Sequence, residues 1–178
     1  IGQVSELARR RAPSRPADAV AAIMTTDTRP KTASAHFSIG AQCFTVWGCA
    51  KGAGMIHPHM ATMLSVILTD IRLPAGFLRR CLKRPAEKTF NRISVDGDTS
   101  TNDSLFLLAN GARGVFSQTP TALERKFSQA LWAVCRSLSQ QIVADGEGAT
   151  RIMTVRVEGA PSHREAKRLA ETVTTSAL

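Results

Sequence analysis

One segment, residues 121–144, restricts the fold of this sequence more than any other. Apolar side chains recur there at intervals of three or four residues, a spacing that places them along one face of an α-helix. They are Leu123, Phe127, Ala130, Leu131, Val134, Leu138 and Ile142. Thr121 and Glu124 fit a capping box at the start of the segment, and Asp145-Gly146 ends it. We therefore predict a long helix whose apolar stripe packs into the core.

Shorter apolar segments predict strands and two further helices. Strands are expected over residues 19–24, 36–47, 62–68, 91–95, 104–109 and 151–158. A helix over residues 74–88 would be kinked or shortened by Pro85, and a capping box of Ser162 with Glu165 opens a last helix. Residues 1–18 are expected to form a loop or frayed helix, and residues 48–58 a glycine-rich loop. This uneven alternation favours a layered α/β or α+β fold.

Charge and hydropathy argue against several classes of partner. The chain has 23 Lys and Arg against 14 Asp and Glu, but the basic residues are dispersed and there is no tyrosine to stack on bases. We therefore expect no nucleic-acid partner. The longest apolar run, residues 60–68, is too short to span a bilayer, so no membrane partner is expected either. Four cysteines without a secretion signal favour a cytoplasmic protein with reduced thiols.

The spacing of candidate ligands does not favour a metal site. Cysteine and histidine cluster in one part of the chain without CxxC or HxxxH spacing, at Cys43, Cys49, His57 and His59. A second polar cluster lacks the spacing of a calcium loop and is interpreted as turn-forming and hydrogen-bonding; it contains Asp96, Asp98, Asn102 and Asp103. The two histidines are interpreted as loop residues, and no metal is expected.

A threonine stands where a glycine-rich loop meets an apolar run, in KGAGMIHPHMATML at residues 51–64. A threonine hydroxyl is a weak nucleophile unless a base lies beside it. If the chain were cut between Ala61 and Thr62, the new α-amino group, with a pKa of about 7.7–8.0, would supply that base. The residues alone leave two interpretations open: a self-released nucleophile, and a threonine that only starts a strand.

Four segments together resemble the ornithine acetyltransferase family, also called glutamate N-acetyltransferases. They are TTDTRPK (25–31), KGAGMIHPHMATML (51–64), FNRISVDGDTSTNDSLFLLANG (90–111) and DGEGAT (145–150). The family pattern for the second is KGxGMIxPNMATML, so His59 replaces an asparagine. The matches occur in the family's order from about residue 20 onward, which makes the resemblance specific.

The resemblance implies an acetyltransferase that cuts itself between Ala61 and Thr62. Residues 1–61 would be the C-terminal part of an alpha subunit and residues 62–178 the N-terminal part of a beta subunit, in one interleaved domain. The two pieces would form a heterodimer that pairs into a heterotetramer. Thr62, once freed, would act as nucleophile and base. It would take an acetyl group from N-acetylornithine, release ornithine and pass the acetyl group to glutamate, without cofactor or metal.

The resemblance also implies which residues bind substrate. Besides Thr62, Lys51 would engage a carboxylate, Thr25 or Thr26 would contact the substrate, and Glu147 would pair with its amino group. The implied fold is a layered α/β/β/α sandwich of the N-terminal-nucleophile-like type. It would be incomplete at both ends, because the oxyanion hole and a pocket-closing segment are expected outside residues 1–178. Two alternatives remain: a threonine-dependent amidase or aminopeptidase-like hydrolase, and an inactive fragment or basic binding module.

Overall fold

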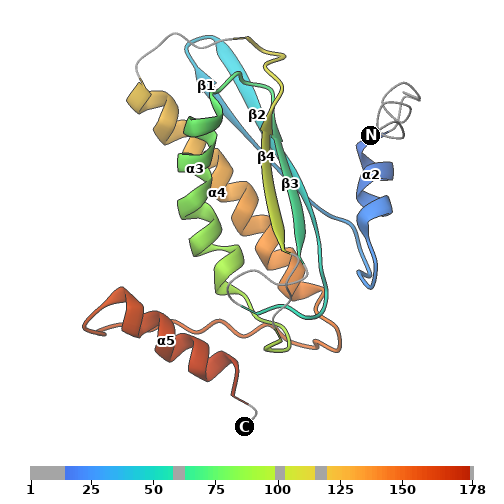
Figure 1. Ribbon diagram of the computed structural model, residues 1–178, viewed down its shortest axis with the longest axis vertical. Coiled ribbons are helices and arrows are strands. Elements are labelled where there is room, and N and C mark those ends of the chain that lie inside the picture. Colours follow the sequence, from blue (N-terminus) through green and yellow to red (C-terminus); the bar gives the residue numbers. More distant parts are fainter. Residues whose placement is uncertain (1–14, 58–62, 99–102, 115–119, 177–178) are drawn as a thin grey trace.

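The computed structural model describes residues 15–57, 63–98, 103–114 and 120–176 (Figure 1). Its elements in chain order are α2 (Pro16–Ile23), β1 (Lys31–Ile39), β2 (Gln42–Lys51), β3 (Leu64–Thr69), α3 (Ala75–Lys88), the short 3-10 helix η1 (Phe90–Arg92), β4 (Ser104–Ala109), α4 (Pro120–Ala144) and α5 (His163–Thr174). The strands form one mixed sheet in the order β1-β2-β3-β4. The first two pairings are antiparallel, and β4 lies parallel to β3.

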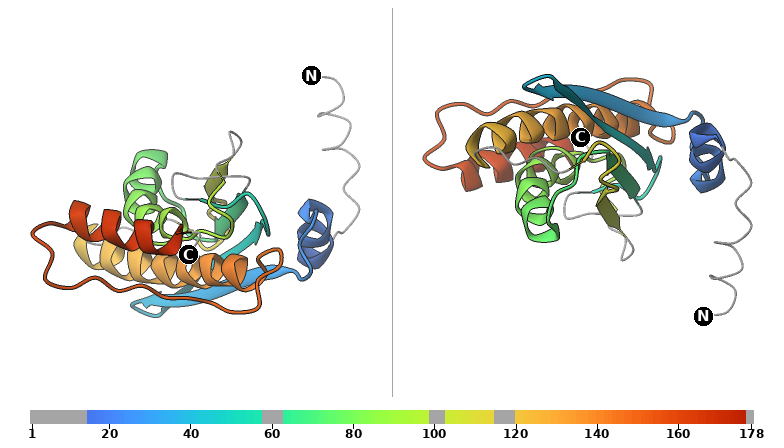
Figure 2. Two further views of the ribbon diagram at one scale, coloured as in Figure 1. Left: turned by 90° about the horizontal axis from the view of Figure 1, so that it is seen from below. Right: turned by 90° about the horizontal axis from the view of Figure 1, so that it is seen from above.

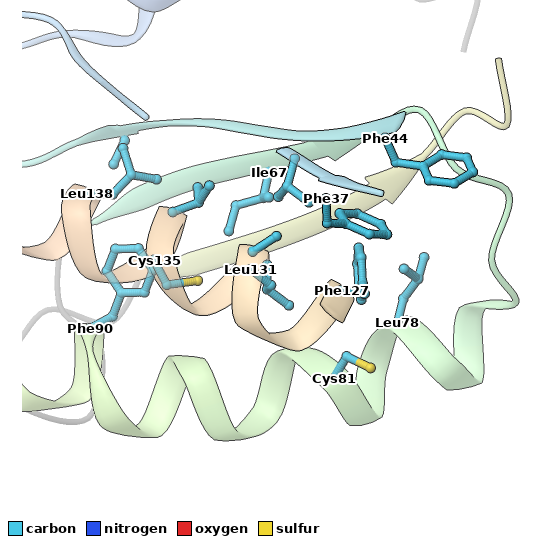
Figure 3. Close-up of a cluster of buried hydrophobic side chains, with 14 of the residues drawn as sticks. Phe37, Phe44, Ile67, Leu78, Cys81, Phe90, Phe127, Leu131, Cys135 and Leu138 are labelled. Atoms are coloured by element: carbon cyan, nitrogen blue, oxygen red, sulfur yellow. The ribbon is translucent and has the colours of Figure 1, made fainter. Parts of the chain in front are cut away.

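Helices α3 and α4 cover one face of this sheet, and the core lies between the two layers (Figure 2). All seven residues of the predicted apolar stripe are buried, so the long helix is confirmed. Figure 3 shows Phe127, Leu131 and Leu138 filling the space between helices and strands. A Cβ on Gly48 of β2 would lie 3.1 Å from the Leu138 side chain, so this glycine lets α4 approach the sheet closely.

The predicted strand over residues 36–47 is confirmed as a hairpin of two strands. Its turn contains Gly40, whose φ of 57° lies in the left-handed region that glycine adopts without strain. Strand β2 is longer than expected, because it continues to Lys51 and pairs there with Leu64 of β3. The glycine-rich loop therefore begins at Gly52. The predicted strands over residues 62–68 and 104–109 correspond to β3 and β4.

Three predicted strands are wrong. Residues 19–24 belong largely to helix α2, which starts with Pro16 in its first turn and with the Arg15 backbone N–H donating to the Asp18 carboxylate. Residues 91–95 start in η1 and continue as irregular chain. Residues 151–158 alternate as a strand does, but no described strand pairs with them, and Met153 is 60% exposed. An alternating pattern by itself does not form a strand, because the backbone must also pair with a neighbouring strand.

Helix boundaries differ from the sequence prediction at two points. Pro85 is buried inside α3 and does not stop it, because the helix continues to Lys88. Helix α4 begins at Pro120, so Thr121 lies inside the helix and is not its cap. Ser162 is confirmed as the N-cap of α5, since its Oγ accepts the backbone N–H of Glu165 at 3.3 Å. The Ser162 hydroxyl in turn donates to the Glu165 carboxylate at 2.9 Å.

The α/β class is confirmed. The described residues supply one sheet and one helical layer, out of the four layers that the resemblance implies, and α2 and α5 lie at the periphery (Figure 1). Among the described helices, none is both long and apolar enough to cross a membrane.

Candidate active site

The loop that leaves β2 is the centre of the candidate site. Its backbone turns sharply, with φ of 143° at Gly52 and 55° at Met55. The second value is unusual for a residue with a side chain and marks a conformation that the surroundings must hold in place. The predicted Ala61-Thr62 cut follows this loop, and it lies with His59 outside the described residues.

Lys51 and Thr25 meet at one end of this loop. The Lys51 ammonium donates to Thr25 Oγ1 at 3.5 Å. Lys51 is half-buried at the end of β2, whereas Thr25 is exposed in the turn after α2. Thr26 is exposed as well, so of the two candidate threonines the structure brings Thr25 into contact with Lys51.

Glu147 lies against the same loop from the other side. Its backbone N–H donates to the Ala53 carbonyl at 2.7 Å. Its carboxylate packs on Gly54, where an added Cβ would lie 2.9 Å from both Cδ and Oε2. No ion pair joins Lys51 to Glu147 in the part of the chain that the structure describes. The two opposite charges therefore stand near one loop, each available to a ligand.

The Asp27 carboxylate holds the end of the loop next to Lys51. Its carboxylate accepts the backbone N–H of Gly52 at 2.7 Å and that of Thr25 at 3.2 Å. Burial acts to raise the pKa of Asp27, but hydrogen bonds from Lys31, Gly52 and Thr25 outweigh burial and lower it. A charged carboxylate thus binds the backbone at both Thr25 and Gly52.

A buried lysine joins Asp27 to the end of α4. Lys31 Nζ lies 2.5 Å from Asp27 Oδ1 and 2.5 Å from Asp145 Oδ2, and the three side chains are at most 2% exposed. Asp145 also accepts the backbone N–H of Thr28 at 3.0 Å and the Thr28 hydroxyl. Burial acts to raise the pKa of Asp145, but Lys31 and Thr28 lower it to about 2.

Sequence reasoning missed this cluster. Asp27 and Lys31 carry opposite charges four residues apart in TTDTRPK, and this spacing was the one signal available. Asp145 gives no such signal, because the sequence predicts it only as the end of a helix. Its contact with Lys31 spans 114 residues and exists only in the folded chain.

The chain on the far side of the predicted cut is held by Asp103. Its Oδ1 accepts the backbone N–H of Met63, the residue after Thr62, at 2.6 Å. Its Oδ2 is buried without a partner among the described residues, and burial raises the pKa of Asp103 although the Met63 N–H opposes the shift. Asp96 similarly accepts backbone N–H groups of Met55 and Ile56 before the cut. The interpretation of these aspartates as hydrogen-bonding residues is confirmed.

The other described residues that were weighed as ligands form no metal cluster. Cys49 is buried whereas Cys43 is exposed, and the His57 ring contacts Ser94 at 3.5 Å. Within the described ranges, no three His, Cys, Asp or Glu side chains are placed to hold a metal ion. Asn102 lies outside these ranges.

Nearly the whole chain matches the model of one known family. The ArgJ family model matches residues 2–178. This chain belongs to the ArgJ family. The resemblance drawn from the four sequence segments is therefore confirmed, and the candidate site described above is that of an ArgJ-family chain.

Two relatives are similar in sequence to this ArgJ-family chain. It is 48% identical over 163 residues to the arginine biosynthesis bifunctional protein ArgJ of Symbiobacterium thermophilum, covering 91% of this chain and 40% of that protein. It is 47% identical over 163 residues to the glutamate N-acetyltransferase of Methanocaldococcus jannaschii, covering 90% of this chain and 40% of that protein. The chain thus spans about two fifths of the length of these relatives.

A solved structure supports the fold. The crystal structure of the arginine biosynthesis bifunctional protein ArgJ from Bacillus halodurans superposes with a TM-score of 0.58 and 39% sequence identity. The superposition covers 62% of this chain and 53% of the other. Over this part of the chain, the fold is therefore similar to that of an ArgJ protein.

Proposed function

We propose that this chain carries the self-cleavage segment and part of the substrate site of an acetyltransferase that moves an acetyl group from N-acetylornithine to glutamate. The observation that carries the proposal is the convergence of Thr25, Lys51 and Glu147 on the loop that leads to the predicted cut. The names of the two relatives, an arginine biosynthesis protein and a glutamate N-acetyltransferase, support the same reaction.

The arrangement of charges suits amino-acid substrates. Lys51 would bind the α-carboxylate, with Thr25 beside it, and Glu147 would bind a free ammonium group such as that at the end of the ornithine side chain. A cation and an anion that face one loop without pairing to each other match a ligand that carries both charges. Neither residue needs a cofactor for this role.

The chemistry would start with scission of the peptide bond between Ala61 and Thr62. The freed Thr62 amine would accept the hydroxyl proton while the oxygen attacks the acetyl carbonyl of N-acetylornithine. Ornithine leaves with that proton on its amine, and the acetyl ester remains on Thr62. The amine of glutamate then attacks the ester, and the threonine hydroxyl is restored.

The fold supports two pieces that stay together after the cut. Residues 1–61 would end one piece and residues 62–178 would begin the other. Strand β2 from the first pairs with β3 from the second, from Val46–Thr69 to Lys51–Leu64. Both pieces would share one sheet and one core, as an alpha–beta heterodimer that we propose to associate further into a heterotetramer.

The proposed location of this reaction is the cytoplasm. All four cysteines are unpaired, which suits a reducing compartment.

Intact-mass analysis of the full-length protein tests the function directly. We expect two pieces divided between Ala61 and Thr62, and one acetyl group added to the second piece on incubation with N-acetylornithine. Thr62→Ala should stay in one piece and take no acetyl group. Full turnover by Thr62→Ala would overturn the proposal, and release of free acetate without acetylglutamate would favour a hydrolase instead.

A further inference from the structure

The buried Lys31 cluster has no part in the acetyl transfer as proposed, although it lies beneath the residues that would bind substrate. Its ammonium is 1% exposed and contacts two carboxylates, at 2.5 Å each, from segments far apart in the chain. A buried ion pair is weak evidence for stability, because the loss of hydration offsets much of the attraction. The cluster therefore calls for an explanation in terms of what it holds together.

One carboxylate of the cluster holds the Thr25–Lys51 pair. Asp27 accepts the backbone N–H of Thr25 and that of Gly52, the residue after Lys51. Any displacement of the Asp27 carboxylate would move both backbone segments. The position of the carboxylate-binding pair thus depends on where Lys31 holds Asp27.

The other carboxylate determines where the Glu147 segment leaves α4. The Asp145 backbone N–H donates to the Gln141 and Ile142 carbonyls at 3.1 and 3.2 Å, so Asp145 is fixed to the last turn of that helix. Glu147 follows two residues later, and its own N–H bonds to Ala53. The position of the ammonium-binding side therefore depends on where Lys31 holds Asp145.

Charge is required for this link. Without the Lys31 ammonium, the two buried carboxylates would face each other as like charges, and their repulsion would separate the segments. Arg29 contacts Asp145 at 3.5 Å, but its side chain is 62% exposed and is not paired with Asp27 in the described part of the chain. Among the residues that the structure describes, Lys31 alone bridges both acids.

We propose that Lys31 is a positioning residue that sets the spacing between the carboxylate-binding pair Thr25–Lys51 and the ammonium-binding Glu147, and thereby the selectivity for substrates that carry both charges. This inference rests on the proposed function. It predicts that loss of Lys31 weakens recognition of the second charge far more than it weakens catalysis.

The test compares two acetyl donors on the full-length protein: N-acetylornithine, which has the terminal ammonium, and N-acetylnorvaline, which lacks it. For Lys31→Met we expect the ratio of the two kcat/KM values to fall about tenfold, through a higher KM for N-acetylornithine. Lys31→Arg keeps a cation that can bind two carboxylates and should restore most of the ratio. Lys126→Met is the matched control, because this lysine bonds to the Ser38 carbonyl, at the other end of β1 from the cluster.

Each outcome decides the proposal. If Lys31→Met does not fold, the uncharged triple variant Asp27→Asn, Lys31→Met, Asp145→Asn carries the test: its side chains do not repel one another, but no ammonium joins the two segments, so a loss of selectivity is still expected. A folded variant that keeps the wild-type ratio overturns the positioning role while the proposed function stands. A wild-type protein that transfers acetyl from neither donor overturns both.

Discussion

Substitution of Gly54 by alanine adds one carbon atom next to the Glu147 carboxylate, and so tests the role of Glu147 in the candidate site. In Gly54→Ala the new Cβ would lie 2.9 Å from Cδ and Oε2 of Glu147, whereas ordinary van der Waals contact begins at 3.4 Å. The carboxylate must therefore move by about half an ångström or more. The backbone can accept alanine, since Gly54 is not among the glycines with a left-handed φ.

We expect Gly54→Ala to weaken substrate binding without lowering the stability of the fold. Glu147 is exposed, so its side chain can swing away freely, and a Gly→Ala change at a compatible backbone position adds about 0.4–1 kcal/mol of stability. A displaced carboxylate would lose most of a charge-assisted hydrogen bond to the substrate ammonium, which is about 1.5–3 kcal/mol. This loss corresponds to roughly 10- to 100-fold in kcat/KM for N-acetylornithine.

Steady-state kinetics and thermal melting of the full-length protein measure both effects. Gly76→Ala, at the start of α3, is the matched control, because its Cβ would meet no atom closer than 4.0 Å. We expect the control to keep wild-type kinetics and Gly54→Ala to lose selectivity for N-acetylornithine over N-acetylnorvaline. Wild-type KM values in Gly54→Ala, or a large drop in its melting temperature, would refute the assignment of Glu147 or the reasoning about its freedom to move.

Three further predictions concern assembly and stability. The two pieces made by the cut should migrate together on a native gel, because β2 and β3 share a ladder, and separation without denaturant would contradict this. The pKa of Asp145 is about 2 when folded against a usual 3.8, so the unfolded chain binds more protons between these values. Urea denaturation should therefore show that Asp145 contributes roughly 2 kcal/mol of stability that is lost as the pH falls from 4 to 2. Asp145→Asn should show a smaller slope but keep the part that comes from Asp27, whose pKa is also lowered. Phe127→Ala removes a side chain with no exposed surface and should reduce the free energy of unfolding by about 3–5 kcal/mol. Phe106→Ala, at a side chain that is 49% exposed, should cost about 1 kcal/mol or less, and equal losses would contradict the assigned core.

Sequence patterns predict the structure correctly where the whole pattern lies within one helix or strand. The stripe of α4 runs from Leu123 to Ile142 in a helix of 25 residues, and the burial of that face follows from helical geometry alone. The continuous apolar runs of β3 and β4 were equally clear. The N-cap at Ser162 is predicted correctly because its hydrogen bond to Glu165 is made within a few residues.

Patterns failed where a neighbour decides the outcome. Residues 19–24 and 151–158 are short enough to be helix, strand or irregular chain, and the choice depends on capping groups or on backbone pairing with another strand. Asp103 shows the same limit at the site, since its bond to the Met63 N–H joins residues 40 positions apart.

The sequence by itself determined the α/β class, the long core helix and the family, because periodicity and ordered motifs are written along the chain. It also named Thr25, Lys51 and Glu147, through the resemblance. Only the tertiary structure brought Thr25, Lys51 and Glu147 to one loop and buried Lys31 between Asp27 and Asp145. The reason is physical. Lys31 can bind both carboxylates only when folding removes water from around it and brings Asp145, which is far away in the sequence, as close as Asp27, at 2.5 Å.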